Sequence, residues 1–219
     1  MNNEIYVIAI PIFLIVLIVV GLLNYNSRFT EEVHKEPFSF LNQFPYEMQN
    51  NPTMRYTFFF KITASIFGAL IASYGVNLFI LEAPTVSKIL PGYISAVLFL
   101  IIGLSIYMQC VISLKYYHIH LIVSALCFGL TVINYVICGI FVLTDTHMYS
   151  NVLAYFLFAL ALILLIVLIV SPLKRWMYLE KEEKDGTTRY YRNKIAVLPF
   201  MEWLFILSNV ILVVLLGVF

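Results

Sequence analysis

Residues 152–170 read VLAYFLFALALILLIVLIV and carry no charged side chain. An apolar run of eighteen or more residues is long enough, as a helix, to cross about 30 Å of hydrocarbon. In lipid, backbone amides must be satisfied within their own segment, so the run predicts a transmembrane α-helix. The whole chain agrees, because 62% of its 219 residues are hydrophobic and only 11% are charged. Soluble chains carry about 25% charged residues.

Five further runs have the same character. The six expected spans cover residues 5–23, 57–81, 90–114, 118–143, 150–170 and 198–219. We therefore predict an all-α polytopic membrane protein in which residues 1–219 form a single transmembrane domain. The first run is interpreted as a retained span, because residues 1–4 lack positive charge and the run exceeds the usual signal-peptide core.

Basic residues predict the orientation of these spans. With the amino terminus outside, twelve of the thirteen lysines and arginines fall on the cytoplasmic side, and only Lys88 falls outside. Short cytoplasmic loops are enriched in lysine and arginine. We therefore expect both termini outside, with cytoplasmic loops at residues 24–55 and 172–197.

The second cytoplasmic loop centres on Asp185-Gly186. Asp-Gly is the pair favoured in two-residue hairpin turns, so a small β-hairpin over residues 178–192 is expected, pairing Glu182 with Arg189 and Lys181 with Tyr190. The alternative is that the fifth helix continues through residues 180–184 and ends at Gly186. The basic residues of this loop suit anionic lipid headgroups or a cytoplasmic partner; they are Lys174, Arg175, Lys181, Lys184, Arg189, Arg192 and Lys194.

The first cytoplasmic loop contains an aromatic, proline-bracketed stretch from Pro37 to Tyr46. This stretch suits the headgroup region or a docking partner. The interpretation we favour is an interfacial loop that buries its aromatic residues against its own bundle.

The second span carries small residues at four-residue spacing. Such ridges let helix backbones approach closely in lipid, so the pattern predicts a helix–helix contact. We favour a partner within the chain over a second copy. The ridge is Ala64, Gly68 and Ala72, and the parallel set beside it is Ser65, Ala69 and Ser73.

Polar side chains inside the spans are few and mostly neutral. Interhelical hydrogen bonding is the favoured role, and the alternative is a pore or substrate path lined by Gln109, Thr131, Asn134 and Asn209. No ionisable residue falls near the centre of a span, which argues against proton-coupled transport. Glu202 and Lys61 lie near a span boundary, where we expect structural roles.

No catalytic or metal-binding pattern emerges from the sequence. His118 and His120 differ by about 200° around a helix, so they do not suit one metal ion. Nucleophile-elbow, zinc-helix and phosphate-loop motifs are lacking, and no polar residues are expected to cluster at one depth. We predict no metal or cofactor, no catalytic residue and no nucleic-acid partner, and we expect a protein that is not an enzyme.

The leading hypothesis is a non-enzymatic membrane subunit that anchors, senses or gates. Its loops would engage a soluble partner or other copies, as a homo-oligomer or complex, in a plasma membrane or bacterial inner membrane and in a system such as microbial stress or defence. The first alternative is a small oligomeric channel or transporter for a neutral solute. The second is a lipid-modifying enzyme using Glu202, His118 or His120.

Overall fold

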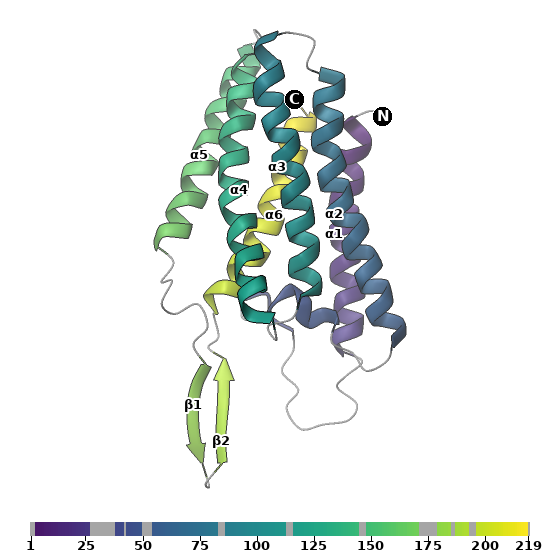
Figure 1. Ribbon diagram of the computed structural model, residues 1–219, viewed down its shortest axis with the longest axis vertical. Helices are drawn as coiled ribbons and strands as arrows, with labels where there is room; N and C mark the ends of the chain where they lie inside the picture. The colour runs from purple at the N-terminus through teal and green to yellow at the C-terminus, as the bar shows by residue number, and fades with distance from the viewer. Residues whose placement is uncertain are drawn as a thin grey trace.

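Six long helices form a bundle in the computed structural model (Figure 1). The model describes residues 3–26, 38–41, 43–49, 54–82, 86–112, 116–144, 148–170, 179–184, 187–192 and 196–218. The helices are α1 (Asn3–Asn26), α2 (Met54–Glu82), α3 (Val86–Val111), α4 (Tyr117–Leu143), α5 (Met148–Val170) and α6 (Val197–Val218). A short 3₁₀ helix, η2 (Pro45–Gln49), lies between α1 and α2.

Each of the six helices in the described residues is long and apolar enough to cross a membrane. The expectation of six spans in a multi-pass integral membrane protein is thereby confirmed. The third helix ends at Val111, a few residues before the expected boundary at 114. The backbone carbonyl of the next residue, Ile112, accepts a hydrogen bond from the His120 ring.

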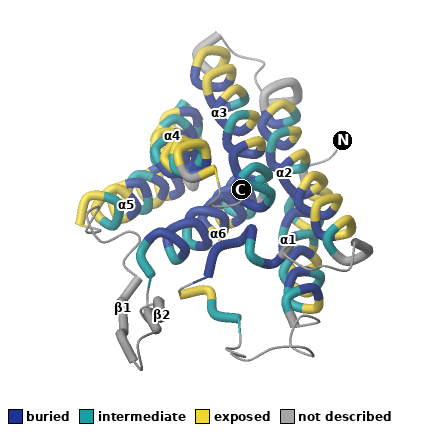
Figure 2. The backbone as a smooth tube through the Cα atoms, turned by 60° about the horizontal axis from the view of Figure 1, so that its bottom comes forward, coloured by how far each residue is buried: buried dark blue, intermediate teal, exposed yellow. Residues whose placement is uncertain are grey.

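The central helix of the bundle is α6, which lies between α4 and α5 on one side and α1 and α2 on the other (Figure 2). In the apolar membrane-spanning part of α6, 61% is buried, whereas the corresponding share is 28% in both α1 and α5. Outward faces of α5 carry exposed large apolar residues such as Val152, Tyr155 and Ile169. Those faces suit lipid contact, because hydrocarbon solvates them without cost.

The small-residue ridge of α2 faces α3. Ala64 and Gly68 are buried, and a Cβ atom added to Gly68 would meet the backbone oxygen of Gly103 at 2.5 Å. The two glycines thus let the α2 and α3 backbones approach closely, within one chain. The parallel set of Ser65, Ala69 and Ser73, about 100° around the helix, is exposed on the neighbouring face.

Replacing Gly68 with valine is expected to destabilise the bundle, because the new side chain would meet backbone atoms that cannot rotate away. Overpacking of this kind costs about 1–3 kcal/mol. The matched control is Ala69→Val on the neighbouring exposed face, which we expect to stay within about 0.5 kcal/mol of wild type. Thermal unfolding in detergent compares the two, and equal melting temperatures would contradict the close α2–α3 contact.

Two strands lie below the helices in Figure 1. β1 (Leu179–Lys184) pairs antiparallel with β2 (Thr187–Arg192), in a register that sets Glu182 opposite Arg189 and Lys181 opposite Tyr190. Within the described residues these two strands form a sheet of their own. Residues 185 and 186, on which the sequence argument centred, lie outside the described residues.

Candidate functional site

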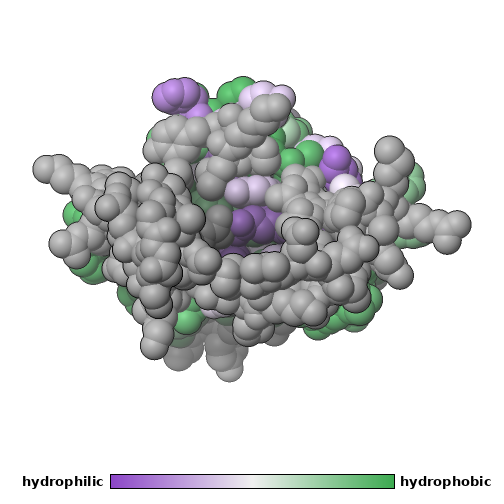
Figure 3. Space-filling view, turned by 90° about the horizontal axis from the view of Figure 1, so that it is seen from below, coloured by the Kyte–Doolittle hydropathy of each residue, from purple (hydrophilic) through white to green (hydrophobic). Residues whose placement is uncertain are grey.

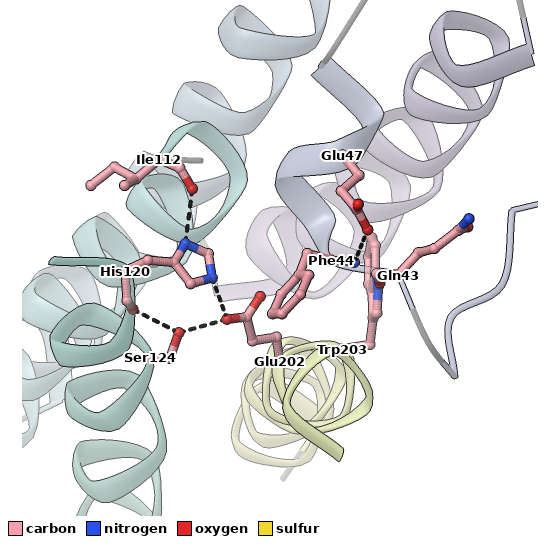
Figure 4. A network of polar contacts seen from close by, with 8 residues as sticks. All are labelled: Gln43, Phe44, Glu47, Ile112, His120, Ser124, Glu202 and Trp203. Atoms are coloured by element: carbon pink, nitrogen blue, oxygen red, sulfur yellow. Dashed lines mark hydrogen bonds and ion pairs between the residues drawn. The ribbon is translucent and has the colours of Figure 1, made fainter. Parts of the chain in front are cut away.

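A buried polar cluster joins α4 to α6 (Figure 4), near the amino-terminal ends of both helices. His120 Nε2 lies 2.8 Å from Glu202 Oε1, and both side chains have no exposed surface. His120 Nδ1 lies 2.8 Å from the backbone oxygen of Ile112. Because a carbonyl only accepts, Nδ1 carries a proton and donates it. One proton then lies between Nε2 and Oε1 and makes the hydrogen bond between imidazole and carboxyl.

Ser124 completes this cluster from the next turn of α4. Residues four apart lie on one helix face, so its hydroxyl reaches the same partner as His120. Ser124 Oγ lies 2.6 Å from Glu202 Oε1 and 2.9 Å from the backbone oxygen of His120. Both neighbours therefore engage one carboxyl oxygen. Serine and histidine are not bonded to each other, so the arrangement differs from a nucleophile–base pair.

Residues 43–49 cover the cluster. The rings of Phe44 and Tyr46 each lie 5.4 Å from the His120 ring, at 84° and 77°. Both are almost fully buried. The favoured interpretation of the first loop, that its aromatic residues pack on the chain's own bundle, is confirmed for these two side chains.

Local sequence explains why η2 forms at this point. Pro45 begins it, and proline suits the first helical position because its missing N–H would have no partner there. The Glu47 carboxylate accepts the Phe44 N–H at 2.8 Å. A glutamate reaching back to the residue before the helix is half of a capping box.

Long-range hydrogen bonds tie this segment to α1 and α6. Trp203 Nε1 donates to the Gln43 carbonyl at 3.0 Å, and the Gln43 amide donates to the Tyr25 hydroxyl at 2.6 Å. Asn24 donates to the Met48 carbonyl, and the Ala196 N–H donates to Leu41 O at 2.8 Å. Viewed from below, hydrophilic residues are visible near the middle of this end of the molecule (Figure 3).

A polar seam continues from the cluster along α4. It recurs in steps of four and three, the spacing that keeps residues on one side of a helix. All of its members are buried: His120, Ser124, Cys127, Thr131, Asn134 and Cys138. Thr131 Oγ1 accepts from Asn209 Nδ2 at 2.9 Å, and Ser95 Oγ donates to Asn134 Oδ1 at 2.6 Å.

The candidate residues named from the sequence fall into two groups, neutral polar residues inside the bundle and basic residues in the segment of the sequence that contains the two strands. Gln109, Thr131, Asn134 and Asn209 are all buried inside the bundle. Of the basic residues, Lys181, Lys184, Arg189 and Arg192 occupy the two strands, while Lys174, Arg175 and Lys194 lie outside the described residues. His118 is exposed while His120 is buried, so the expected divergence of the two histidines is confirmed.

One expectation is wrong. We expected no polar residues to cluster at one depth, yet His120, Ser124 and Glu202 meet within hydrogen-bond distance. Glu202 is fully buried, which the sequence alone did not indicate. A usable signal was present in the four-and-three spacing of polar residues through residues 120–138.

No protein-family model matches the chain, and neither a curated protein nor a solved structure matches it. Among the described residues, no group of three or more histidine, cysteine, aspartate or glutamate side chains is placed to hold a metal ion. The function must therefore be argued from the geometry itself.

Proposed function

We propose that the protein is a non-enzymatic integral membrane subunit whose cytoplasmic face engages a soluble partner or further copies of the chain. The β1–β2 ribbon carries the proposal. A two-stranded ribbon is marginal alone in water, and within the described residues β1 and β2 pair only with each other. Each strand leaves one edge open, which a further strand from a partner can extend.

The charge distribution supports the same face as the place of contact. With both termini outside, the ribbon and residues 43–49 lie on the cytoplasmic side together with twelve of the thirteen basic residues. The ribbon itself contains Lys181, Lys184, Arg189 and Arg192. These residues suit an acidic protein surface or anionic lipid headgroups, each contributing about 1 kcal/mol near a charged membrane.

Packing at this end of the bundle supports an anchoring role. Residues 43–49 pack on His120 of α4 and bond to Tyr25 of α1 and Trp203 of α6. Anchoring requires no chemistry from the buried side chains.

Charge reversal in the ribbon tests the proposal. We expect a tagged full-length chain in mild detergent to bring down an associate, either a soluble protein or a second copy. The Arg189→Glu/Arg192→Glu variant should bind that associate at least ten-fold more weakly. The control, Lys88→Glu, reverses the charge that lies on the opposite side of the membrane in this topology and should bind normally. A wild-type chain that runs as a lone monomer would sink the proposal.

A second candidate, a membrane enzyme acting on lipid, is favoured by the cluster of His120, Ser124 and Glu202 at one end of the bundle. Such a role requires residues 43–49 to move aside, since Phe44 and Tyr46 cover His120. Ser124→Ala removes the hydroxyl with little change in volume. Lipid profiles that are identical in cells carrying wild-type and variant chains would remove this candidate.

A further inference from the structure

Several fully buried polar atoms in the bundle have no hydrogen-bond partner among the described residues. They lie on α3, α4 and α6, in side chains with no exposed surface. The atoms are Gln109 Nε2, Gln109 Oε1, Asn134 Nδ2, Glu202 Oε2 and Asn209 Oδ1. Native proteins rarely leave such groups unsatisfied, because each retains its desolvation cost.

These atoms lie along the α4 seam, beside residues of the seam that are hydrogen-bonded. Glu202 lies beside Ser124, Gln109 beside the Cys127 thiol, and Asn209 beside Thr131. Asn134 lies farther along, bonded through its other amide atom to Ser95. From His120 to Cys138 the seam extends about 27 Å at 1.5 Å per residue. That length is close to the hydrocarbon thickness of a bilayer.

The chemistry of these atoms restricts what can satisfy them. Amide nitrogens need an acceptor, whereas amide and carboxyl oxygens need a donor. A metal cation can bind the amide and carboxyl oxygens but cannot accept a hydrogen bond from the amide nitrogens. The surroundings are tightly packed, as the Phe128 and Phe205 rings show at 4.6 Å between centroids, so the ligand must be small.

We infer that internal water molecules occupy the α3–α4–α6 seam and connect Glu202 to Asn134 through Gln109 and Asn209. Water both donates and accepts, and proteins hold about one buried water per 27 residues. The seam is thus a row of internal water sites in an otherwise apolar bundle, and it ends at the His120–Glu202 pair. This inference does not depend on the proposed partner-binding function.

Hydroxyl-radical footprinting by radiolysis tests the inference on the wild-type chain. Radicals form from water, so a buried ring beside internal water is labelled although bulk solvent cannot reach it. Phe128 and Phe205 flank the seam, whereas Phe67 and Phe99 are equally buried. We expect Phe128 and Phe205 to be labelled at least three-fold faster. Equal rates for the four rings would overturn the inference.

An apolar variant provides the second measurement. Thr131→Val/Asn209→Leu removes polar groups from the middle of the seam and should bring Phe205 labelling down to the rate of Phe67. The control is Thr63→Val, which removes a buried hydroxyl that bonds within α2 and should leave the rate unchanged. Unchanged labelling of Phe205 in the double variant would also overturn the inference. If that variant does not fold, the wild-type comparison decides.

Discussion

Replacing His120 with alanine is expected to lower the free energy of unfolding by about 3–5 kcal/mol. The reason is electrostatic as well as steric. Glu202 is fully buried, and His120 is one of the two side chains that contact its Oε1 atom. Without the imidazole, Ser124 is the one partner that Oε1 keeps among the described residues, and the Ile112 carbonyl loses its ring donor.

Two variants make that prediction specific. His118→Ala removes a histidine two residues away that is exposed, and we expect a change within about 0.5 kcal/mol. His120→Leu/Glu202→Leu removes both partners together and should recover most of the loss, since apolar residues of similar volume can replace a buried polar pair. Thermal or denaturant unfolding in detergent gives all three values. A His120→Ala loss no larger than that of His118→Ala would contradict a coupled buried pair.

Replacing Phe44 with alanine is expected to cost about 3–5 kcal/mol, the usual range for a buried phenylalanine. Phe44 is 4% exposed. Its ring contacts both His120 and Tyr46, so the truncation opens a cavity directly above the polar cluster. The attachment of residues 43–49 to the bundle should weaken as well.

The matched control is Phe40→Ala in the same loop, because Phe40 is 38% exposed. We expect it to cost clearly less than Phe44→Ala. Hydrogen exchange provides a local readout, since the amides of residues 43–49 should exchange at least ten-fold faster in the Phe44 variant than in the Phe40 variant. Equal exchange in the two variants would show that Phe44 does not hold the segment in place.

The helices could be predicted from sequence because lipid imposes a strict local rule. An apolar run of sufficient length must satisfy its own backbone, and only a helix does so within one segment. Residues 152–170 therefore predict α5 without reference to any other part of the chain. The spacing of small residues in α2 is local information of the same kind, but it did not separate the buried ridge of Ala64 and Gly68 from the exposed set of Ser65, Ala69 and Ser73.

The pairing of side chains from distant segments was beyond this reasoning. His120 and Glu202 are 82 residues apart, and Trp203 bonds to Gln43 over 160 residues. Nothing in the spacing of either pair along the chain encodes their contact. It arises because α6 lies at the centre of the bundle and brings its second turn against α4 and residues 43–49.

The sequence by itself therefore determined that this protein is a multi-pass helical membrane protein, since hydropathy and helix length are properties of single segments. Tertiary structure alone decided which polar residues are hidden. Glu202 looked like a boundary residue because depth along a helix can be counted, whereas burial depends on what packs against that helix. The residues that bond to Glu202, His120 and Ser124, lie 82 and 78 residues away in the sequence, and only the folded bundle brings them together.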